Sequence, residues 1–133
     1  MINNKNQLKK ALKENKNKIF ITRLYNFDDN NKIKVGDSAT IEKVQSNAFT
    51  IKYNAYDKEA WVYYDNIDVK DNKIIYYNYI PDYKKEEAEK LAKIKNVELL
   101  PVADDDKINN DKYSNYKYCY KYVTIINKIV EVL

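Results

Sequence analysis

The chain has 133 residues, a formal net charge of +4, fourteen tyrosines, no histidine, and only one cysteine, one tryptophan and one glycine. The missing histidine excludes His-based acid–base catalysis and Cys/His zinc sites, and one cysteine cannot form an intramolecular disulfide. A single glycine cannot build a glycine-rich phosphate loop. We therefore expect a small binding protein rather than an enzyme, with no cofactor and no bound metal.

Positive charge is concentrated in the first third of the chain. Residues 1–34 carry a net charge of +6, residues 35–82 of −3 and residues 83–133 of +1. A basic surface of this size suits phosphates or an acidic protein surface. No apolar run approaches the roughly 20 residues of a membrane span, and the N-terminus has no apolar signal core. We expect a cytoplasmic protein without membrane contact.

The first predicted element is a helix over residues 3–15. Asn3 or Asn4 can cap its first amide groups, and Leu8 and Leu12 recur at the spacing of one helix face. Lysines occupy the opposite face. We expect this helix to cover one end of a sheet.

Five short strands are predicted next, because apolar residues alternate or form short runs between turn residues. They cover residues 18–27, 38–45, 48–53, 60–64 and 73–80. In the fourth strand, Trp61 and Tyr63 share one face. Closure of such strands into a barrel removes exposed edges. The predicted fold is therefore α+β, with a small five-stranded antiparallel SH3-like or OB-like barrel behind the N-terminal helix.

Turn residues separate these strands, and at one place the alternation of apolar and polar residues shifts by one position. The predicted turns are Gly36-Asp37, Ser46-Asn47 and Asp71-Asn72. Gly36 occupies the turn where a positive φ is most needed, so its loss should impair folding. The apolar parity shifts between Ile41 and Val44, which predicts a β-bulge or a barrel bend.

Residues 83–133 are predicted to extend a barrel domain that spans residues 1–82. A helix over residues 83–95 follows Pro81, and Asp82 is its predicted cap. The narrow apolar stripe of this helix consists of Ala88, Leu91, Ala92 and Ile94. We expect the extension to pack on the barrel.

The end of the chain is predicted to be a β-hairpin. Its apolar residues also have helical spacing, but β-branched residues and a turn at Asn127-Lys128 favour pairing of residues 121–126 with residues 129–133. The fifth predicted strand is apolar on both faces. Either this C-terminal segment or a second copy of the chain must cover it.

Three segments carry a family resemblance. They are Lys34-Val35-Gly36-Asp37, Glu42-Lys43-Val44-Gln45-Ser46-Asn47-Ala48-Phe49 and Glu59-Ala60-Trp61-Val62-Tyr63-Tyr64. With the leading helix, they resemble a group of small proteins of phages and other mobile elements in low-G+C bacteria, which share a KVQ[ST]N-aromatic hairpin and a tryptophan strand. The resemblance covers residues 3–80, and Ala60 stands where such members commonly have serine. It implies a shared fold and a mobile-element origin, and small accessory genes of such elements often inhibit bacterial defence systems.

Alternating tyrosines near the C-terminus form the most function-like pattern. We call Tyr116, Tyr118, Tyr120 and Tyr122 the tyrosine row. In a strand these rings share one face, with Lys117 and Lys121 on the other. The row can cover this protein's own helices, form an aromatic protein interface, or stack on single-stranded bases.

The remaining candidates are basic residues near the N-terminus. Arg23, the only arginine, can pair with a carboxylate or anchor a partner on the basic surface. The candidate partner-binding residues are Tyr116, Tyr118, Tyr120, Tyr122, Arg23, Lys9 and Lys13. The acidic run of residues 104–106 lacks the glycine and the final glutamate of an EF-hand loop, and Cys119 has no group nearby to activate it.

These patterns predict a non-catalytic binding protein. We expect it to inhibit a bacterial defence effector, such as a CRISPR nuclease, by protein–protein contact. The alternative is a single-stranded nucleic-acid-binding module that uses the tyrosine row and nearby lysines. The sequence leaves homodimerisation open.

Overall fold

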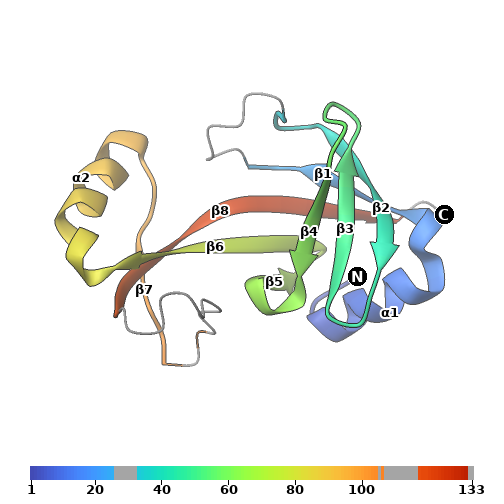
Figure 1. Ribbon diagram of the computed structural model, residues 1–133, viewed down its shortest axis with the longest axis horizontal. Coiled ribbons are helices and arrows are strands. Elements are labelled where there is room, and N and C mark those ends of the chain that lie inside the picture. Colours follow the sequence, from blue (N-terminus) through green and yellow to red (C-terminus); the bar gives the residue numbers. More distant parts are fainter. Residues whose placement is uncertain (26–32, 105, 107–116, 132–133) are drawn as a thin grey trace. The chain divides into compact units, whose positions relative to one another are not determined.

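The computed structural model describes residues 1–25, 33–104, 106 and 117–131. It is an α+β fold with two α-helices and an antiparallel sheet of eight strands, shown in Figure 1. The helices are α1 (Lys5–Asn15) and α2 (Lys85–Lys95), and the 3-10 turns are η1 (Lys16–Lys18), η2 (Tyr64–Asn66) and η3 (Asp82–Lys84). The strands are β1 (Ile19–Arg23), β2 (Ser38–Val44), β3 (Ala48–Tyr53), β4 (Glu59–Tyr63), β5 (Ile67–Lys70), β6 (Lys73–Pro81), β7 (Leu100–Pro101) and β8 (Tyr118–Glu131).

The chain divides into two compact units. The first, which we call the core unit, consists of Met1–Tyr76 and Thr124–Leu133, and the second, the tyrosine unit, is Tyr77–Val123. The strands β6 and β8 each contribute residues to both units. The strand order of the sheet is β4-β3-β2-β1-β8-β6-β5, and β7 pairs with β8.

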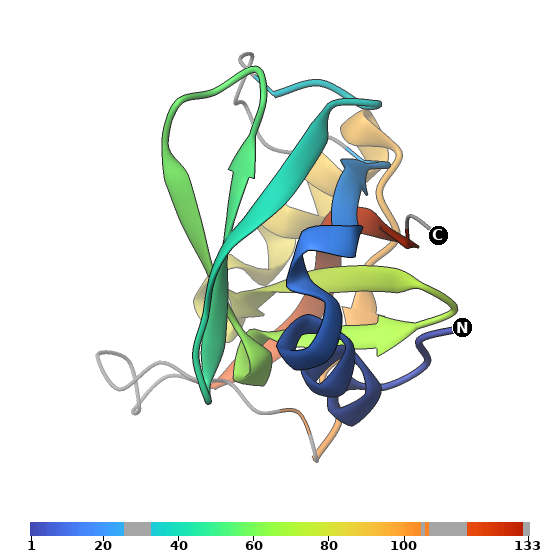
Figure 2. The ribbon, with the colours of Figure 1, turned by 90° about the vertical axis from the view of Figure 1, so that its right-hand side faces the viewer.

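The core unit is organised around one apolar cluster to which α1 and most of its strands contribute. Asn4 caps α1, because its Oδ1 accepts a hydrogen bond from the Gln7 backbone N–H (2.8 Å). Leu8 and Leu12, one turn apart on this helix, are buried in the cluster. The helix contacts β1 and β5, and Figure 2 shows it from the side of the core unit. The predicted N-terminal helix and its cap are confirmed.

Local turn and bulge predictions also hold in the core unit. Gly36 has a φ of +95°, and Asp71 and Asn72 have φ values of 53° and 60°. The β2–β3 ladder shifts register between Ile41 and Val44, as the parity change predicted. Short-range chemistry therefore determines these features.

The predicted five-stranded barrel is not confirmed, because the sheet has eight strands and is not closed. Sequence patterns missed β5, whose four residues pair with the start of β6. The C-terminal strand β8 lies between β1 and β6 in the strand order, so it extends the sheet instead of covering it. The first strand is also shorter than predicted and ends at Arg23, while residues 26 and 27 of that prediction lie outside the described part of the chain.

The predicted C-terminal hairpin is wrong, because residues 118–131 form the single strand β8. Its ladder with β1 runs without a break from Ile19↔Glu131 to Arg23↔Asn127. Asn127, placed in a turn by the sequence analysis, is buried, and its Oδ1 accepts a hydrogen bond from Tyr53 Oη (2.5 Å). A buried partner from another strand thus satisfies the side-chain oxygen of the residue that the local pattern assigned to a turn.

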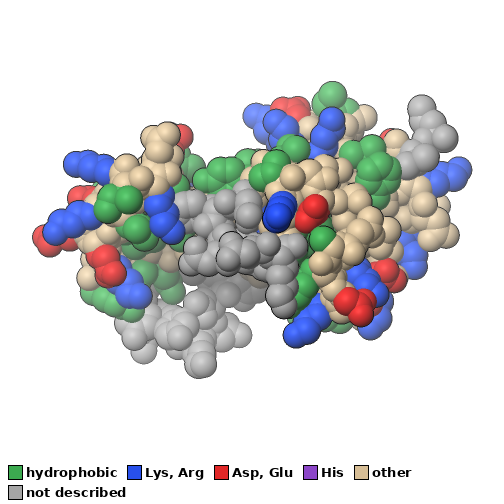
Figure 3. Space-filling view, turned by 90° about the horizontal axis from the view of Figure 1, so that it is seen from above, with side chains coloured by type: hydrophobic (Ala, Val, Ile, Leu, Met, Phe, Trp, Pro, Cys, Tyr) green, Lys and Arg blue, Asp and Glu red, His purple; other side chains and the backbone are tan. Residues whose placement is uncertain are grey.

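The second helix forms as predicted, but with a different start and without burial. A 3-10 turn begins at Asp82, and α2 itself begins after Lys84, which makes no side-chain capping bond. Asn96 ends the helix in the left-handed conformation, with a φ of 54°. No residue of α2 is buried, and Ile94 is 81% exposed. Figure 3 shows the hydrophobic side chains of this region interspersed with charged ones. No helix in the described part of the chain is long and apolar enough to cross a bilayer.

Candidate functional site

The described rings of the tyrosine row contact residues of their own unit. Tyr118, Tyr120 and Tyr122 are half-buried in β8, whereas Tyr116 lies outside the described residues. The Tyr118 ring meets the Tyr79 ring edge-on, with centroids 6.2 Å apart. The Tyr122 hydroxyl accepts a hydrogen bond from Asn78 Nδ2 (2.5 Å). These contacts support the alternative in which the row packs within the chain.

Tyr120 connects β8 to α2. Its hydroxyl donates a hydrogen bond to Glu89 Oε1 (2.9 Å), and Lys85 Nζ lies 5.9 Å from the centroid of its ring. The hydrogen bond to Glu89, together with burial, raises the pKa of Tyr120. This ring therefore holds the helix on the strand and is only partly available to a partner.

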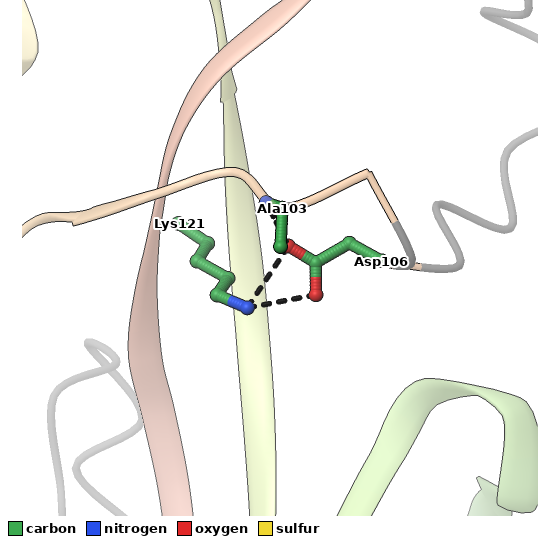
Figure 4. Close-up of polar contacts among 3 residues, drawn as sticks. All are labelled: Ala103, Asp106 and Lys121. Atoms are coloured by element: carbon green, nitrogen blue, oxygen red, sulfur yellow. Dashed lines mark hydrogen bonds and ion pairs between the residues drawn. The ribbon is translucent and has the colours of Figure 1, made fainter.

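Lys121, on the same strand, is engaged by a carboxylate. Its Nζ lies 2.7 and 2.9 Å from the two oxygens of Asp106, and Asp106 Oδ2 also accepts a hydrogen bond from the Ala103 backbone N–H (2.8 Å), as Figure 4 shows. Burial would raise the pKa of Asp106, but the two hydrogen bonds and the Lys121 charge outweigh it and lower that pKa. The hydrogen bond from Lys121 to Asp106 in turn raises the pKa of Lys121. This lysine also lies 5.0 Å from the centroid of the Tyr77 ring.

The basic candidates belong to the core unit, whereas the described tyrosines of the row lie in the tyrosine unit. Arg23 is only 2% exposed, its Nε donates a hydrogen bond to the Tyr25 carbonyl (3.3 Å), and its guanidinium lies 5.7 Å from the Tyr53 ring centroid. Arg23 is therefore an interior residue and does not present its charge on the surface. Lys9 and Lys13 are exposed on α1.

A pair of exposed aromatic rings on β4 forms a different candidate site. Trp61 and Tyr63 are 43% and 44% exposed, and their rings are stacked with centroids 6.2 Å apart and planes 23° apart. They pair across the ladder with Thr50 and Ala48 of β3, both fully buried. Since residues paired across two strands share a face, the two rings lie over these small side chains. The result is an exposed aromatic surface, which we call the aromatic platform.

Two ion pairs lie next to the aromatic rings and balance the charge around them. Lys43 Nζ lies 3.3 Å from Glu59 Oε2, and Lys52 Nζ lies 2.9 Å from Asp57 Oδ1. Hydrogen bonding to Asp57 raises the pKa of Lys52, and the same bond lowers the pKa of Asp57. The lysines near the rings therefore add little net positive charge to this surface.

The described residues form no grouped set of metal ligands, and the thiol of Cys119 is not activated. Within the described ranges, no three acidic or cysteine side chains are grouped so that they could hold a metal ion. Cys119 is half-buried, with its Sγ 3.5 Å from the Ile80 carbonyl oxygen. Burial, and next the Asp82 charge, raise the pKa of the Cys119 thiol, which disfavours the reactive thiolate.

Comparison with family models, with curated proteins and with solved structures returned no match. The site must therefore be judged on its geometry. Alternation along β4 already placed Trp61 and Tyr63 on one face, but it carried no information on where β4 lies in the sheet. The longer repeat of the tyrosine row made it the predicted site, and the shorter aromatic pair on β4 was not among the predicted site residues.

Proposed function

We propose that this chain is a non-catalytic binding protein that uses the stacked rings of Trp61 and Tyr63 to inhibit a bacterial defence effector by direct contact. The observation that carries the binding role is the exposure of two large, stacked rings on β4. Tryptophan and tyrosine are enriched among the residues that dominate the energy of protein interfaces. The class of target is supported by the resemblance of residues 3–80 to proteins of phages and mobile elements.

The surroundings of the rings favour a protein partner over a single-stranded nucleic acid. Base stacking on aromatic rings is normally accompanied by a positively charged groove for the phosphates. Here Lys43 and Lys52 are paired with Glu59 and Asp57. A polar, electrically balanced rim around an aromatic centre is typical of protein interfaces.

The decisive experiment measures infection and binding with one pair of variants. Bacteria carrying a CRISPR system that targets a phage should plate that phage more efficiently when they express this protein, and Trp61→Ala should remove most of the gain. Loss of such an anchor weakens binding by at least about 30-fold (about 2 kcal/mol). Tyr83→Ala, at a 69% exposed ring in the tyrosine unit, is the matched control and should retain protection.

A second measurement tests the alternative that this site binds single-stranded nucleic acid. Trp61 is the only tryptophan, so its fluorescence reports directly on this site. We expect no quenching by single-stranded DNA at low salt. Strong quenching that weakens steeply with salt would favour the nucleic-acid reading, and unchanged plating with the wild-type protein would exclude inhibition of that CRISPR system.

A further inference from the structure

The strand β4 has an edge that no other strand occupies in the described part of the chain. It lies at one end of the strand order and pairs only with β3. The strand at the other end, β5, has four residues, and the turn after it is hydrogen-bonded to the N-terminal segment through Asn72 and Ile2. An unoccupied edge offers backbone N–H and C=O groups to another extended chain.

The ladder shows which backbone groups face this edge. The Tyr64 N–H donates a hydrogen bond to the Asn47 carbonyl oxygen (3.1 Å). Asn47 lies opposite Tyr64 in the register that pairs Ala48 with Tyr63. Hydrogen-bonded and non-hydrogen-bonded pairs alternate along an antiparallel ladder. The backbone groups of Trp61 and Tyr63 therefore point away from β3, towards the open edge.

The same two residues thus present both their rings and their backbone hydrogen-bonding groups. A strand added at this edge would bond to the N–H and C=O groups of Trp61 and to the N–H of Tyr63, because the Tyr63 carbonyl already accepts the first hydrogen bond of η2. Its side chains at two alternate positions would lie beside the indole and phenol rings. Residues 60–63 are uncharged, and the ion pairs of Lys43 and Lys52 balance the charge next to them. The complementary ligand is therefore an extended, uncharged segment.

We propose that β4 binds an extended segment of another protein by strand addition, with apolar or β-branched side chains at alternate positions of that segment. Such binding combines main-chain hydrogen bonds, which supply affinity, with side-chain contacts, which supply specificity. The inference rests on the proposed function, and it adds the binding mode and the chemical class of the partner.

The ligand side of the test uses defined peptides. Phage-displayed random heptapeptides are selected on the intact protein, and the enriched sequences are synthesised with and without N-methyl groups at alternate residues. We expect apolar or β-branched residues at alternate positions and a shift of Trp61 emission on binding. N-methylation of the peptide amides that face β4 should weaken binding by about 30-fold, because it removes two main-chain hydrogen bonds between the peptide and the strand.

The protein side compares two substitutions at one position. Tyr63→Ala and Tyr63→Pro both remove the ring, but only proline also removes the edge-facing N–H. Proline is tolerated on an edge strand when its nitrogen faces outward. We expect Tyr63→Pro to bind the peptides about tenfold more weakly than Tyr63→Ala. If Tyr63→Pro does not fold by circular dichroism, Glu59→Pro against Glu59→Ala makes the same comparison at the first residue of β4.

Three results would overturn strand addition. They are a selection that enriches no peptide able to shift Trp61 emission, equal binding of methylated and unmethylated peptides, and equal binding by the alanine and proline variants. Self-association of the wild-type protein that Trp61→Ala abolishes would instead make a second copy of the chain the occupant, and would overturn the assignment of this edge to another protein. Failure of the proposed function is distinguishable, because peptides would then bind β4 as expected while phage plating stayed unchanged.

Discussion

The two units of this chain are stabilised by different kinds of contact. The core unit buries a cluster of large apolar side chains that includes Phe49, Leu8 and Ile74, whereas the tyrosine unit buries only Ile80 among its described residues. Burial of apolar area is the larger contribution to stability in the first case. The second unit depends on polar contacts, each worth about 1 kcal/mol. The two units should therefore respond differently to mutation.

The polar contacts of the tyrosine unit involve residues of β8. Lys121 pairs with Asp106, and Tyr120 hydrogen-bonds to Glu89 of α2. The helix itself buries no side chain, and Leu91 is 46% exposed. This comparison teaches that an apolar stripe in a helical pattern does not ensure a core, because burial also requires an apolar surface opposite it. Four pairs of variants test the comparison.

The largest effect is expected from truncation in the core. Phe49→Ala removes a fully buried ring and should lower the free energy of unfolding of the core unit by about 3–5 kcal/mol. Leu91→Ala in α2 is the control and should cost less than about 0.5 kcal/mol, because much of Leu91 is already exposed. Urea denaturation followed by circular dichroism measures both. Similar losses for the two variants would contradict the proposed difference between the units.

The next effect concerns the ion pair of the tyrosine unit. Asp106→Asn removes the charge that Lys121 contacts and should destabilise this unit by about 1–2 kcal/mol at neutral pH. Asp57→Asn, at an exposed pair of the core unit, should cause no measurable change. Amide hydrogen exchange of residues 118–123 of β8 reports on this unit directly.

The Asp106 variant also has a defined pH dependence. Because the folded-state pKa of Asp106 is lowered, its carboxylate contributes stability above its ordinary pKa of about 4, and that contribution is lost as the pH falls through the lowered value. The wild type and Asp106→Asn should therefore converge in strongly acidic solution. A difference that persists there would show that charge is not the cause.

Substitutions at residues with a positive φ should have a smaller effect on the stability of each unit. Gly36→Ala should destabilise the core unit by about 1 kcal/mol, and the cause is conformational, because a Cβ at Gly36 would meet no atom within 4 Å. Asn96→Gly in the tyrosine unit should be neutral or slightly stabilising, because glycine adopts the left-handed cap more readily. Thermal unfolding measures both. A destabilised Asn96→Gly would point to a contact of the Asn96 side chain.

The smallest effect comes from removing one hydroxyl group in each unit. The Tyr64 hydroxyl is buried and, among the described residues, has no hydrogen-bond partner. Tyr64→Phe should therefore be neutral or stabilise the core unit by up to about 1 kcal/mol. Tyr120→Phe should instead destabilise the tyrosine unit, since the hydroxyl of Tyr120 bonds to Glu89. Urea denaturation that gave both variants the same sign would contradict this difference.

Alkaline pH gives a further measure of the Tyr64 environment. Burial raises the pKa of Tyr64 to about 12, so the folded state keeps this proton longer than the unfolded state, whose tyrosine pKa is about 10. Stability from this group is fully present below pH 10 and is lost as the pH rises towards 12. Tyr64→Phe should reduce this loss, which denaturation at a series of pH values would show.

The local features of the core unit follow from short stretches of sequence. The cap at Asn4, the turn at Gly36 and the shift between Ile41 and Val44 each depend on residues a few positions apart. The shared face of Trp61 and Tyr63 follows from alternation in the same way. The sequence by itself determined these elements, because their energies are set by neighbours along the chain.

Only the tertiary structure decided the partners of the strands. The place of β8 between β1 and β6 requires pairing between distant parts of the chain, and no local pattern encodes it. The same holds for the edge position of β4, which makes its aromatic pair a candidate site, and for the interior position of Arg23. Asn127 shows the physical reason most directly. Its own neighbours favour a turn, but Asn127 is buried in the continuous strand β8, where its Oδ1 accepts a hydrogen bond from Tyr53.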